Sequence, residues 1–133
     1  MGVHLSTPNT DKVSEAGTLA GVPYGVSAMQ GWRTSMEQTY STGSISAPGQ
    51  AAVPVFCVFA GFGGPLVALF CKSHLLKELS RLEAWSTGNV EEALRAVFLR
   101  MDEMLRSQEH VAELSRFTQE SCRPPSPDEA PPG

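Results

Sequence analysis

Residues 53–64 read Val-Pro-Val-Phe-Cys-Val-Phe-Ala-Gly-Phe-Gly-Gly, and this stretch decides the fold. Its first part is a run of β-branched and aromatic residues, which predicts a strand buried on both faces. The glycines that follow predict a tight turn, after which Pro65 is placed to open an apolar helix. Many folds carry chemistry at such a junction, but this turn contains no acid, histidine or lysine.

After Pro65 the sequence predicts two long amphipathic helices. In the first, apolar residues recur at steps of three and four positions, which places them on one face. Residues 86–88, Ser-Thr-Gly, interrupt this pattern. Asn89 is a good N-cap with a glutamate three positions later, so a second helix begins there and continues through an apolar stripe at residues 90–105. A weaker helix is predicted around residues 111–117.

Before the central stretch the sequence predicts short strands and flexible connections. Residues 24–29 and 36–40 are typical of strands, and Gly31 permits a turn or bulge at residues 30–33. Residues 41–52 are rich in turn formers and predict a flexible connection. Together with the central strand this makes about three strands and two long helices, which is an α+β fold.

The chain of 133 residues is long enough for one domain. Residues 1–22 are largely polar and Gly-rich and predict an extended N-terminal arm. Residues 23–117 then form the domain, and residues 118–133 predict a disordered Pro-rich tail.

Composition limits both the class of function and the cellular compartment. The net charge of −4 argues against a nucleic-acid-binding protein. Three cysteines without a CxxC pair predict free thiols in a reducing compartment, and hence a cytoplasmic protein, with the nucleus or a weak membrane association as alternatives. The three histidines, His4, His74 and His110, lie far apart and form no ligand pattern, and His74 is predicted on the polar face of its helix.

The first six residues match the pattern M-G-x-x-x-[ST], with Gly2 as a candidate for N-myristoylation. A chance match is the alternative, because the pattern is short. One acyl chain supports only weak, reversible membrane binding, and no polybasic stretch follows it. The same residues do not resemble a secretory signal, since no basic segment precedes an apolar one.

Residues 24–37 read Tyr-Gly-Val-Ser-Ala-Met-Gln-Gly-Trp-Arg-Thr-Ser-Met-Glu, and they resemble the opening motif of the metal-dependent type 2C protein serine/threonine phosphatases, the PPM family. Residues 58–64, Val-Phe-Ala-Gly-Phe-Gly-Gly, lie where that family has Phe-Asp-Gly-His-Gly-Gly. The resemblance covers residues 1–115 and implies the N-terminal portion of a β-sandwich flanked by helical pairs. It also strengthens the myristoylation hypothesis, because the first ten residues resemble the start of eukaryotic members.

The resemblance implies a definite chemistry. Family members use two divalent metals, Mn²⁺ or Mg²⁺, to hold a hydroxide that attacks a phosphoserine or phosphothreonine. An arginine binds the phosphate through its fork of N–H donors, and a histidine in the turn protonates the leaving oxygen. Further metal-binding aspartates of the family lie downstream of the last residue of this chain.

Three positions of this sequence keep the family's groups. Arg33 matches the phosphate-binding arginine, Glu37 matches the first acid of a Met-Glu-Asp motif, and Gly61 could offer its carbonyl to a metal. Four positions are degenerate. The second acid, the histidine two positions later, the metal-bridging aspartate and the turn histidine fall on Gln38, Tyr40, Ala60 and Phe62.

Three hypotheses follow from the resemblance. The first is a truncated phosphatase-like chain that is inactive and binds no Mn²⁺ or Mg²⁺, because one carboxylate cannot replace a bridging ligand. The second is a pseudophosphatase, an interaction module that binds a phosphoprotein or another protein partner, with Arg33 as the phosphate contact. The third is an incomplete part of an active enzyme, although truncation alone would not change Gln38, Ala60 and Phe62.

Overall fold

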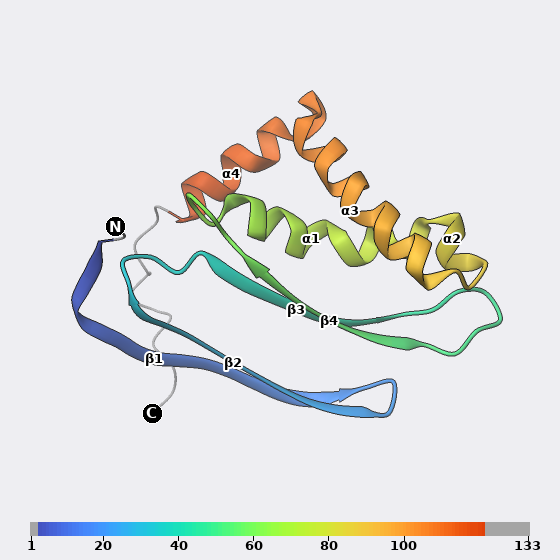
Figure 1. Ribbon diagram of the computed structural model, residues 1–133, viewed down its shortest axis with the longest axis horizontal. Helices are drawn as coiled ribbons and strands as arrows, with labels where there is room; N and C mark the ends of the chain where they lie inside the picture. Colours follow the sequence, from blue (N-terminus) through green and yellow to red (C-terminus); the bar gives the residue numbers. More distant parts are fainter. Residues whose placement is uncertain (1–2, 122–133) are drawn as a thin grey trace.

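The computed structural model describes residues 3–121 of the chain, and in that range four strands precede the helices (Figure 1). The strands are β1 (His4–Leu19), β2 (Val22–Arg33), β3 (Gln38–Ile45) and β4 (Val53–Ala60). The helices are α1 (Leu66–Arg81), α2 (Glu83–Ser86), α3 (Val90–Arg106), the 3₁₀ turn η1 (Gln108–His110) and α4 (Val111–Ser121). The α+β class predicted from the sequence is therefore confirmed.

The strands form two separate antiparallel pairs, β1–β2 and β3–β4. Figure 1 shows three layers, in which the β3–β4 sheet lies between the β1–β2 hairpin and the helices. Helix α1 packs on both strands of the β3–β4 sheet. On the other face, the ring of Tyr24 in β2 lies 5.3 Å from the ring of Phe56 in β4. The arrangement is that of a partial two-sheet sandwich with helices on one side.

The buried core lies between the helices and one face of the β3–β4 sheet. Its largest fully buried side chains are Phe70, Leu79 and Val97, from α1 and α3. From β4, Cys57 and Phe59 pack against this core, whereas Val58 is 82% exposed. The prediction of a strand buried on both faces is therefore wrong. The reason is a cavity of about 250 Å³ between the two sheets, lined in part by Val58, which the β1–β2 hairpin does not fill.

The N-terminal half holds more strand than the sequence suggested. Residues 4–19 form strand β1, which pairs with β2 from Leu19↔Val22 to Lys12↔Met29, where an extended arm was predicted. The strand count is thus four in the described part of the chain, not about three. Strand β1 is almost entirely exposed, so its sequence has no apolar alternation, and backbone pairing holds it in place.

Two further boundaries differ from the prediction. Strand β3 continues to Ile45 because its backbone pairs with β4 as far as Ile45↔Val53, so the flexible connection is shorter than residues 41–52. Strand β2 runs through residues 30–33, and Gly31 adopts the expected left-handed backbone with φ of 67°.

The long helices begin where the sequence predicts, but the first ends at Arg81 and not at residues 86–88, because Leu82 is extended and Glu83–Ser86 forms the separate helix α2. Helix α1 begins directly after Pro65, and the Asn89 side chain caps α3 by accepting a hydrogen bond from the Glu92 N–H at 3.3 Å. Helix α4 continues to Ser121, past the position where the tail was predicted to begin. None of the helices in residues 3–121 has the length and apolar character that crossing a membrane demands. The rest of the predicted tail lies outside the described residues.

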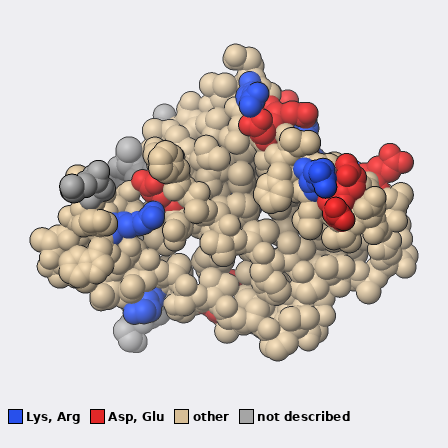
Figure 2. Space-filling view, in the orientation of Figure 1, with Lys and Arg blue, Asp and Glu red and all other residues tan. Residues whose placement is uncertain are grey.

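Charged side chains gather over the helical layer. Figure 2 shows acids and bases side by side over this part of the surface. Along α3 they form ion pairs one helical turn apart, such as Arg95–Glu91 at 3.5 Å and Arg106–Asp102 at 2.8 Å. Such exposed pairs are screened by solvent and contribute little to stability. The mixed signs leave this face without a single-sign charged patch in the described part of the chain.

Candidate functional site

The end of strand β2 and the segment that follows carry Arg33 and Glu37. Both residues line a shallow cavity of about 230 Å³, together with Val3, His4, Thr34 and Ser35. Arg33 is exposed and forms no ion pair with any residue in the range 3–118. The Glu37 carboxylate accepts a hydrogen bond from the Ser35 hydroxyl at 3.0 Å. The cavity therefore combines one guanidinium, one imidazole, one carboxylate and two hydroxyl groups.

Gly61 lies directly against Glu37. The Gly61 N–H donates to the Glu37 backbone oxygen at 3.0 Å, and next to it Gln38 pairs with Ala60 across the β3–β4 sheet. A Cβ atom on residue 61 would lie 2.4 Å from the Glu37 carbonyl oxygen and 2.7 Å from that of Gly64. The fold thus brings the two sequence motifs together, and only glycine fits at their point of contact.

The remaining two family positions point elsewhere. Phe62 is fully exposed in the turn between β4 and α1. Tyr40 lines the cavity between the two sheets, and its ring lies 5.5 Å from the Lys72 ammonium group. Its hydroxyl donates to the Glu15 carboxylate at 3.3 Å. Partial burial, followed by the neighbouring Glu15 carboxylate, raises the pKa of Tyr40.

Glu15 is a residue that sequence reasoning missed. Its carboxylate accepts hydrogen bonds from three hydroxyl groups, those of Tyr24 at 3.5 Å, Tyr40 at 3.3 Å and Thr42 at 3.3 Å. It therefore links the β1–β2 hairpin to the β3–β4 sheet. The sequence carried no signal for this role, because residues 4–19 have no strand pattern that would orient Glu15 toward a second sheet.

Two of the histidines, which the sequence predicted to form no cluster, lie side by side in the structure. His74 and His110 meet in space, with ring centroids 5.6 Å apart, and Glu113 joins them. The His74 side chain is 19% exposed and stacks on Phe70 at 4.5 Å, so it does not belong to a solvated polar face. Helical periodicity cannot detect this cluster, because its members come from α1, η1 and α4.

The remaining residues singled out by the sequence are the three cysteines and Gly2. Cys57 and Cys71 are free thiols, and burial raises the pKa of both. Cys122 and Gly2, the lipidation candidate, lie outside the described residues.

Comparison with known proteins agrees with this geometry. A family model described as protein phosphatase 2C matches residues 22–120. The chain is 44% identical over 115 residues to probable protein phosphatase 2C 11 of Oryza sativa subsp. japonica, covering 86% of this chain and 31% of that protein. It is 39% identical over 115 residues to probable protein phosphatase 2C 21 of Arabidopsis thaliana, covering 86% of this chain and 32% of that protein.

An animal relative gives the same result. Protein phosphatase 1G of Homo sapiens is 38% identical over 120 residues, which is 88% of this chain and 21% of that protein. The chain thus spans about a third or less of the length of these relatives. The family model covers well over half of this chain. This chain therefore belongs to the protein phosphatase 2C family.

Proposed function

We propose that this chain is a phosphatase 2C-type protein that does not hydrolyse phosphoserine or phosphothreonine. The observation that carries the proposal is Ala60, which stands beside Gly61 at the end of the sheet where the family has its metal-bridging aspartate. A methyl group has no lone pair to offer a metal ion, and neither a rotamer change nor a shift of the backbone would supply one.

Family chemistry depends on metal, generally Mn²⁺ or Mg²⁺, and the groups at this end of the sheet do not fit a two-metal centre. Hard cations require several oxygen ligands, and two dications side by side require several negative charges. The cavity at Arg33 borders this region, and so does a second cavity that Gln38 and Pro65 help to line; Glu37 is the one carboxylate among the described residues that line them. Gln38 adds a neutral amide, which is a weak ligand.

The proton donor of the family is replaced as well. Phe62 carries no proton that it could transfer to a leaving oxygen. Tyr40 carries a phenol, but its pKa is raised and its hydroxyl proton is donated to the Glu15 carboxylate between the sheets, away from the turn. Neither side chain is therefore placed to act as the general acid of a hydrolytic step.

The proposal does not depend on the length of the chain. The relatives are proteins named as phosphatases and are about three times longer or more. Additional residues could supply further carboxylates, but they would not restore the bridging ligand at Ala60 or the acid at Phe62. These substitutions also disfavour the hypothesis of an incomplete active enzyme.

The test is Mn²⁺ titration calorimetry on the purified full chain, with far-UV circular dichroism on the same sample. We expect no binding heat up to millimolar Mn²⁺ from wild type and a measurable signal from Ala60→Asp, which adds a carboxylate beside Glu37. Ala52→Asp adds the same charge at another exposed alanine and serves as the control. Each titration is repeated in the His74→Ala background, so that metal bound by the histidines is not counted.

Micromolar Mn²⁺ binding by the His74→Ala variant with Ala60 unchanged, together with phosphate release from a phosphoserine peptide, would contradict the proposal. Phosphate release is measured in parallel for every variant. Because the assay reports turnover separately from binding, a metal site without activity is distinguished from an active enzyme.

A second candidate function is recognition of a phosphorylated protein without hydrolysis. It is supported by the Arg33 guanidinium, which is exposed, lacks an ion-pair partner in residues 3–118, and shares its cavity with His4 and two hydroxyl groups. Arginine binds phosphate bidentately through charge-assisted hydrogen bonds. Glu37 lines the same cavity and lowers its affinity for anions.

Fluorescence anisotropy with a phosphoserine peptide and its unphosphorylated form tests this function. Arg33→Gln should weaken binding of the phosphopeptide by about tenfold or more, as expected for loss of a charge-assisted contact. Lys12→Gln removes a different exposed cation of the hairpin and should leave binding unchanged. Equal affinity for both peptides would refute phosphate recognition.

A further inference from the structure

His74, His110 and Glu113 form a cluster in which the candidate ligand atoms all lie within 4.8 Å of one another. The residues come from α1, η1 and α4, and none of them lines the cavity at Arg33. We propose that this cluster binds one Zn²⁺ ion. The inference does not rest on the proposed function, because it uses no residue of the phosphatase motifs.

The donor set is the one that zinc prefers. Two imidazole nitrogens and one carboxylate oxygen are typical zinc ligands, whereas Mg²⁺ and Ca²⁺ favour oxygen ligands alone. Two imidazoles on one tetrahedral zinc, with bonds of about 2.0–2.1 Å, would have ring centroids about 5 Å apart. The rings of His74 and His110 lie 5.6 Å apart with their planes at 81°. The ligand atoms lie within 4.8 Å of one another, and a tetrahedral ion would draw them to about 3.3 Å apart through side-chain rotation.

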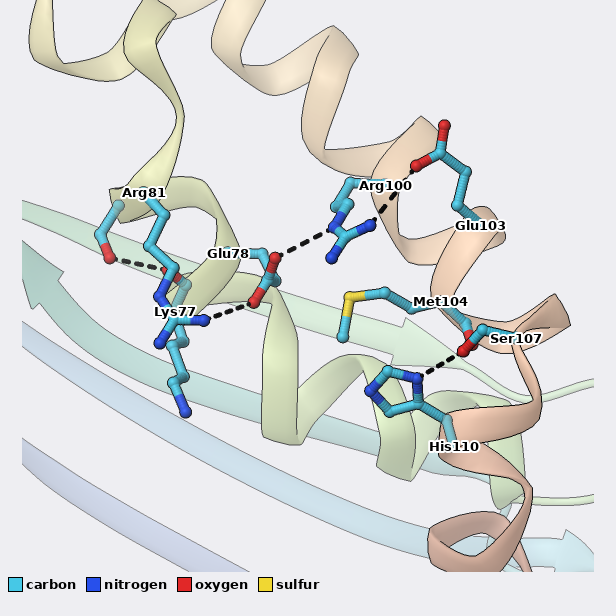
Figure 3. Close-up of polar contacts among 9 residues, drawn as sticks. Lys77, Glu78, Arg81, Arg100, Glu103, Met104, Ser107 and His110 are labelled. Atoms are coloured by element: carbon cyan, nitrogen blue, oxygen red, sulfur yellow. Dashed lines mark hydrogen bonds and ion pairs between the residues drawn. The ribbon is translucent and has the colours of Figure 1, made fainter.

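The hydrogen bonds of Ser107 determine which nitrogen His110 presents. The Ser107 hydroxyl donates its single proton to the Met104 backbone oxygen at 2.9 Å. The hydroxyl oxygen must therefore accept from the His110 Nδ1–H at 2.8 Å, a contact drawn in Figure 3. Nδ1 then carries the proton, and Nε2 keeps a free lone pair. Such a hydrogen bond behind the ring is what fixes a metal-binding histidine in its tautomer.

Packing holds both rings in place. The fully buried ring of Phe70 lies 4.5 Å from His74 and 5.3 Å from His110. Both histidines thus pack against the same core side chain, one from α1 and the other from η1. Preorganised ligands bind metal more tightly, because less side-chain freedom is lost on binding.

His74 and Glu113 form the other side of the site. Without metal, the His74 Nε2–H donates to the Glu113 Oε1 at 2.7 Å. Zn²⁺ binding breaks this hydrogen bond: the ring proton exchanges through solvent from Nε2 to Nδ1, the imidazole stays neutral, and the Nε2 lone pair and the carboxylate oxygen each bind the ion. The two side chains are 19% and 30% exposed, so water and the ion can reach them. Three protein ligands leave the fourth position to water.

The first experiment is a Zn²⁺ titration of the full chain in competition with a chromophoric chelator. We expect one Zn²⁺ per chain, with an affinity reduced at least about tenfold to a hundredfold by His74→Ala and by His110→Ala, since even residues that only orient a ligand have effects of that size. His4→Ala removes the third histidine and is the matched control, with no change expected. Millimolar Mg²⁺ should not compete.

Further variants keep the proposal testable if a histidine variant does not fold. Glu113→Gln removes a partly exposed ligand and should weaken binding while the circular dichroism spectrum stays the same. Ser107→Ala should weaken Zn²⁺ binding less than loss of a ligand does. Ser107→Thr keeps the hydroxyl group and should keep the wild-type affinity, as expected for a positioning residue. Co²⁺ substitution adds a spectrum whose intensity distinguishes four-coordinate from six-coordinate metal.

Absence of Zn²⁺ binding by the folded wild-type chain would overturn the proposal. So would binding that survives both histidine variants but is lost when the thiols are alkylated, because zinc would then be held by cysteines. A six-coordinate Co²⁺ spectrum that is unchanged in the histidine variants would overturn it as well.

Discussion

Gly61 shows how one atom determines whether the two phosphatase motifs can meet. The position has no room for a Cβ, which would lie 2.4 Å from a backbone oxygen and 2.9 Å from the Cβ of Glu37. Backbone atoms cannot rotate away as the end of a long side chain can, so the strand ends must separate. The restriction at this glycine is steric and does not come from a left-handed backbone conformation.

Gly61→Ala should therefore lower the free energy of unfolding by roughly 1–3 kcal/mol, the usual cost of overpacking. Urea denaturation followed by circular dichroism measures the change. Gly25→Ala is the control, because a Cβ at residue 25 has its nearest neighbour at 4.0 Å and β2 is a regular strand there. Equal stability of the two variants would show that the strand ends at Gly61 separate without cost.

Glu78 is the buried charged residue of the described chain, at 9% exposure. Burial opposes its ionisation, but hydrogen bonds from Arg100 at 3.2 Å and Arg81 at 3.0 Å outweigh burial and lower its pKa (Figure 3). A carboxylate with a lowered pKa stabilises the folded state above its ordinary pKa of 4.5, and this contribution is lost as pH falls through the folded value.

Glu78→Gln should lower the free energy of unfolding by roughly 1 kcal/mol at neutral pH, a modest figure because solvent screens the exposed arginines. The difference from wild type should shrink once the pH falls below about 4.5. Urea denaturation at several pH values measures this. Glu91→Gln is the control, since Glu91 is 88% exposed in its ion pair with Arg95 and should matter little. A pH-independent difference at Glu78 would argue against the ion pairs as its cause.

At the scale of elements, α3 is stabilised in two ways, by packing of one face against its neighbours and by a hydrogen bond that caps its N-terminus. Ala93, Val97, Met101 and Met104 are its buried residues and lie three or four positions apart, which packs one face against α1 and α2. At its start, the Asn89 side chain accepts from the Glu92 N–H, one of the donors that a helix leaves unsatisfied.

Asn89→Ala should destabilise the protein by about 0.5–2 kcal/mol, because this cap would be lost. Thermal unfolding followed at a helical wavelength measures the loss. Asn89→Ser keeps a side-chain oxygen at the cap and should retain most of the stability. If alanine and serine are equivalent at residue 89, the hydrogen bond to Glu92 contributes nothing measurable.

At the scale of the whole molecule, burial is concentrated in one part of the chain. Each of the buried core residues lies at Ala47 or later, within the β3–β4 connection and the helices. The β1–β2 hairpin contacts the β3–β4 sheet through Tyr24 and through the hydroxyl groups around Glu15, with a cavity between the sheets. Regions with few buried apolar contacts open locally at low free energy.

Hydrogen exchange measured by mass spectrometry should therefore show faster exchange in β1 and β2 than in α1 and α3. Glu15→Gln should accelerate exchange in the hairpin further, because it weakens the hydrogen bonds from Tyr40 and Thr42, and it should leave the helices unchanged. Asp11→Asn alters an exposed acid of the same hairpin and is the control. Equal protection of hairpin and helices would mean that the molecule opens as one unit.

Local patterns were enough to predict the helical half of the fold. The apolar spacing of α1 and α3, Pro65 before the first and Asn89 before the second are signals that act within a few residues. The two phosphatase motifs were also readable, and so were the changed side chains at Gln38, Ala60 and Phe62. The family membership that these motifs suggested is confirmed by the family model over residues 22–120.

The sequence by itself thus determined the class of fold, the family and the chemical identity of each site residue, because these depend on side chains and on short-range periodicity. Tertiary structure alone decided three features. Residues 4–19 became a strand by backbone pairing with β2, Glu15 acquired three hydroxyl donors from other strands, and His74 met His110 and Glu113. The hairpin pairing is partly local, but strand β1 lacks the apolar alternation that would predict it. The contacts of Glu15 with β3 and of His74 with Glu113 join residues 25 or more positions apart, and no local pattern encodes which distant side chain will be placed beside them.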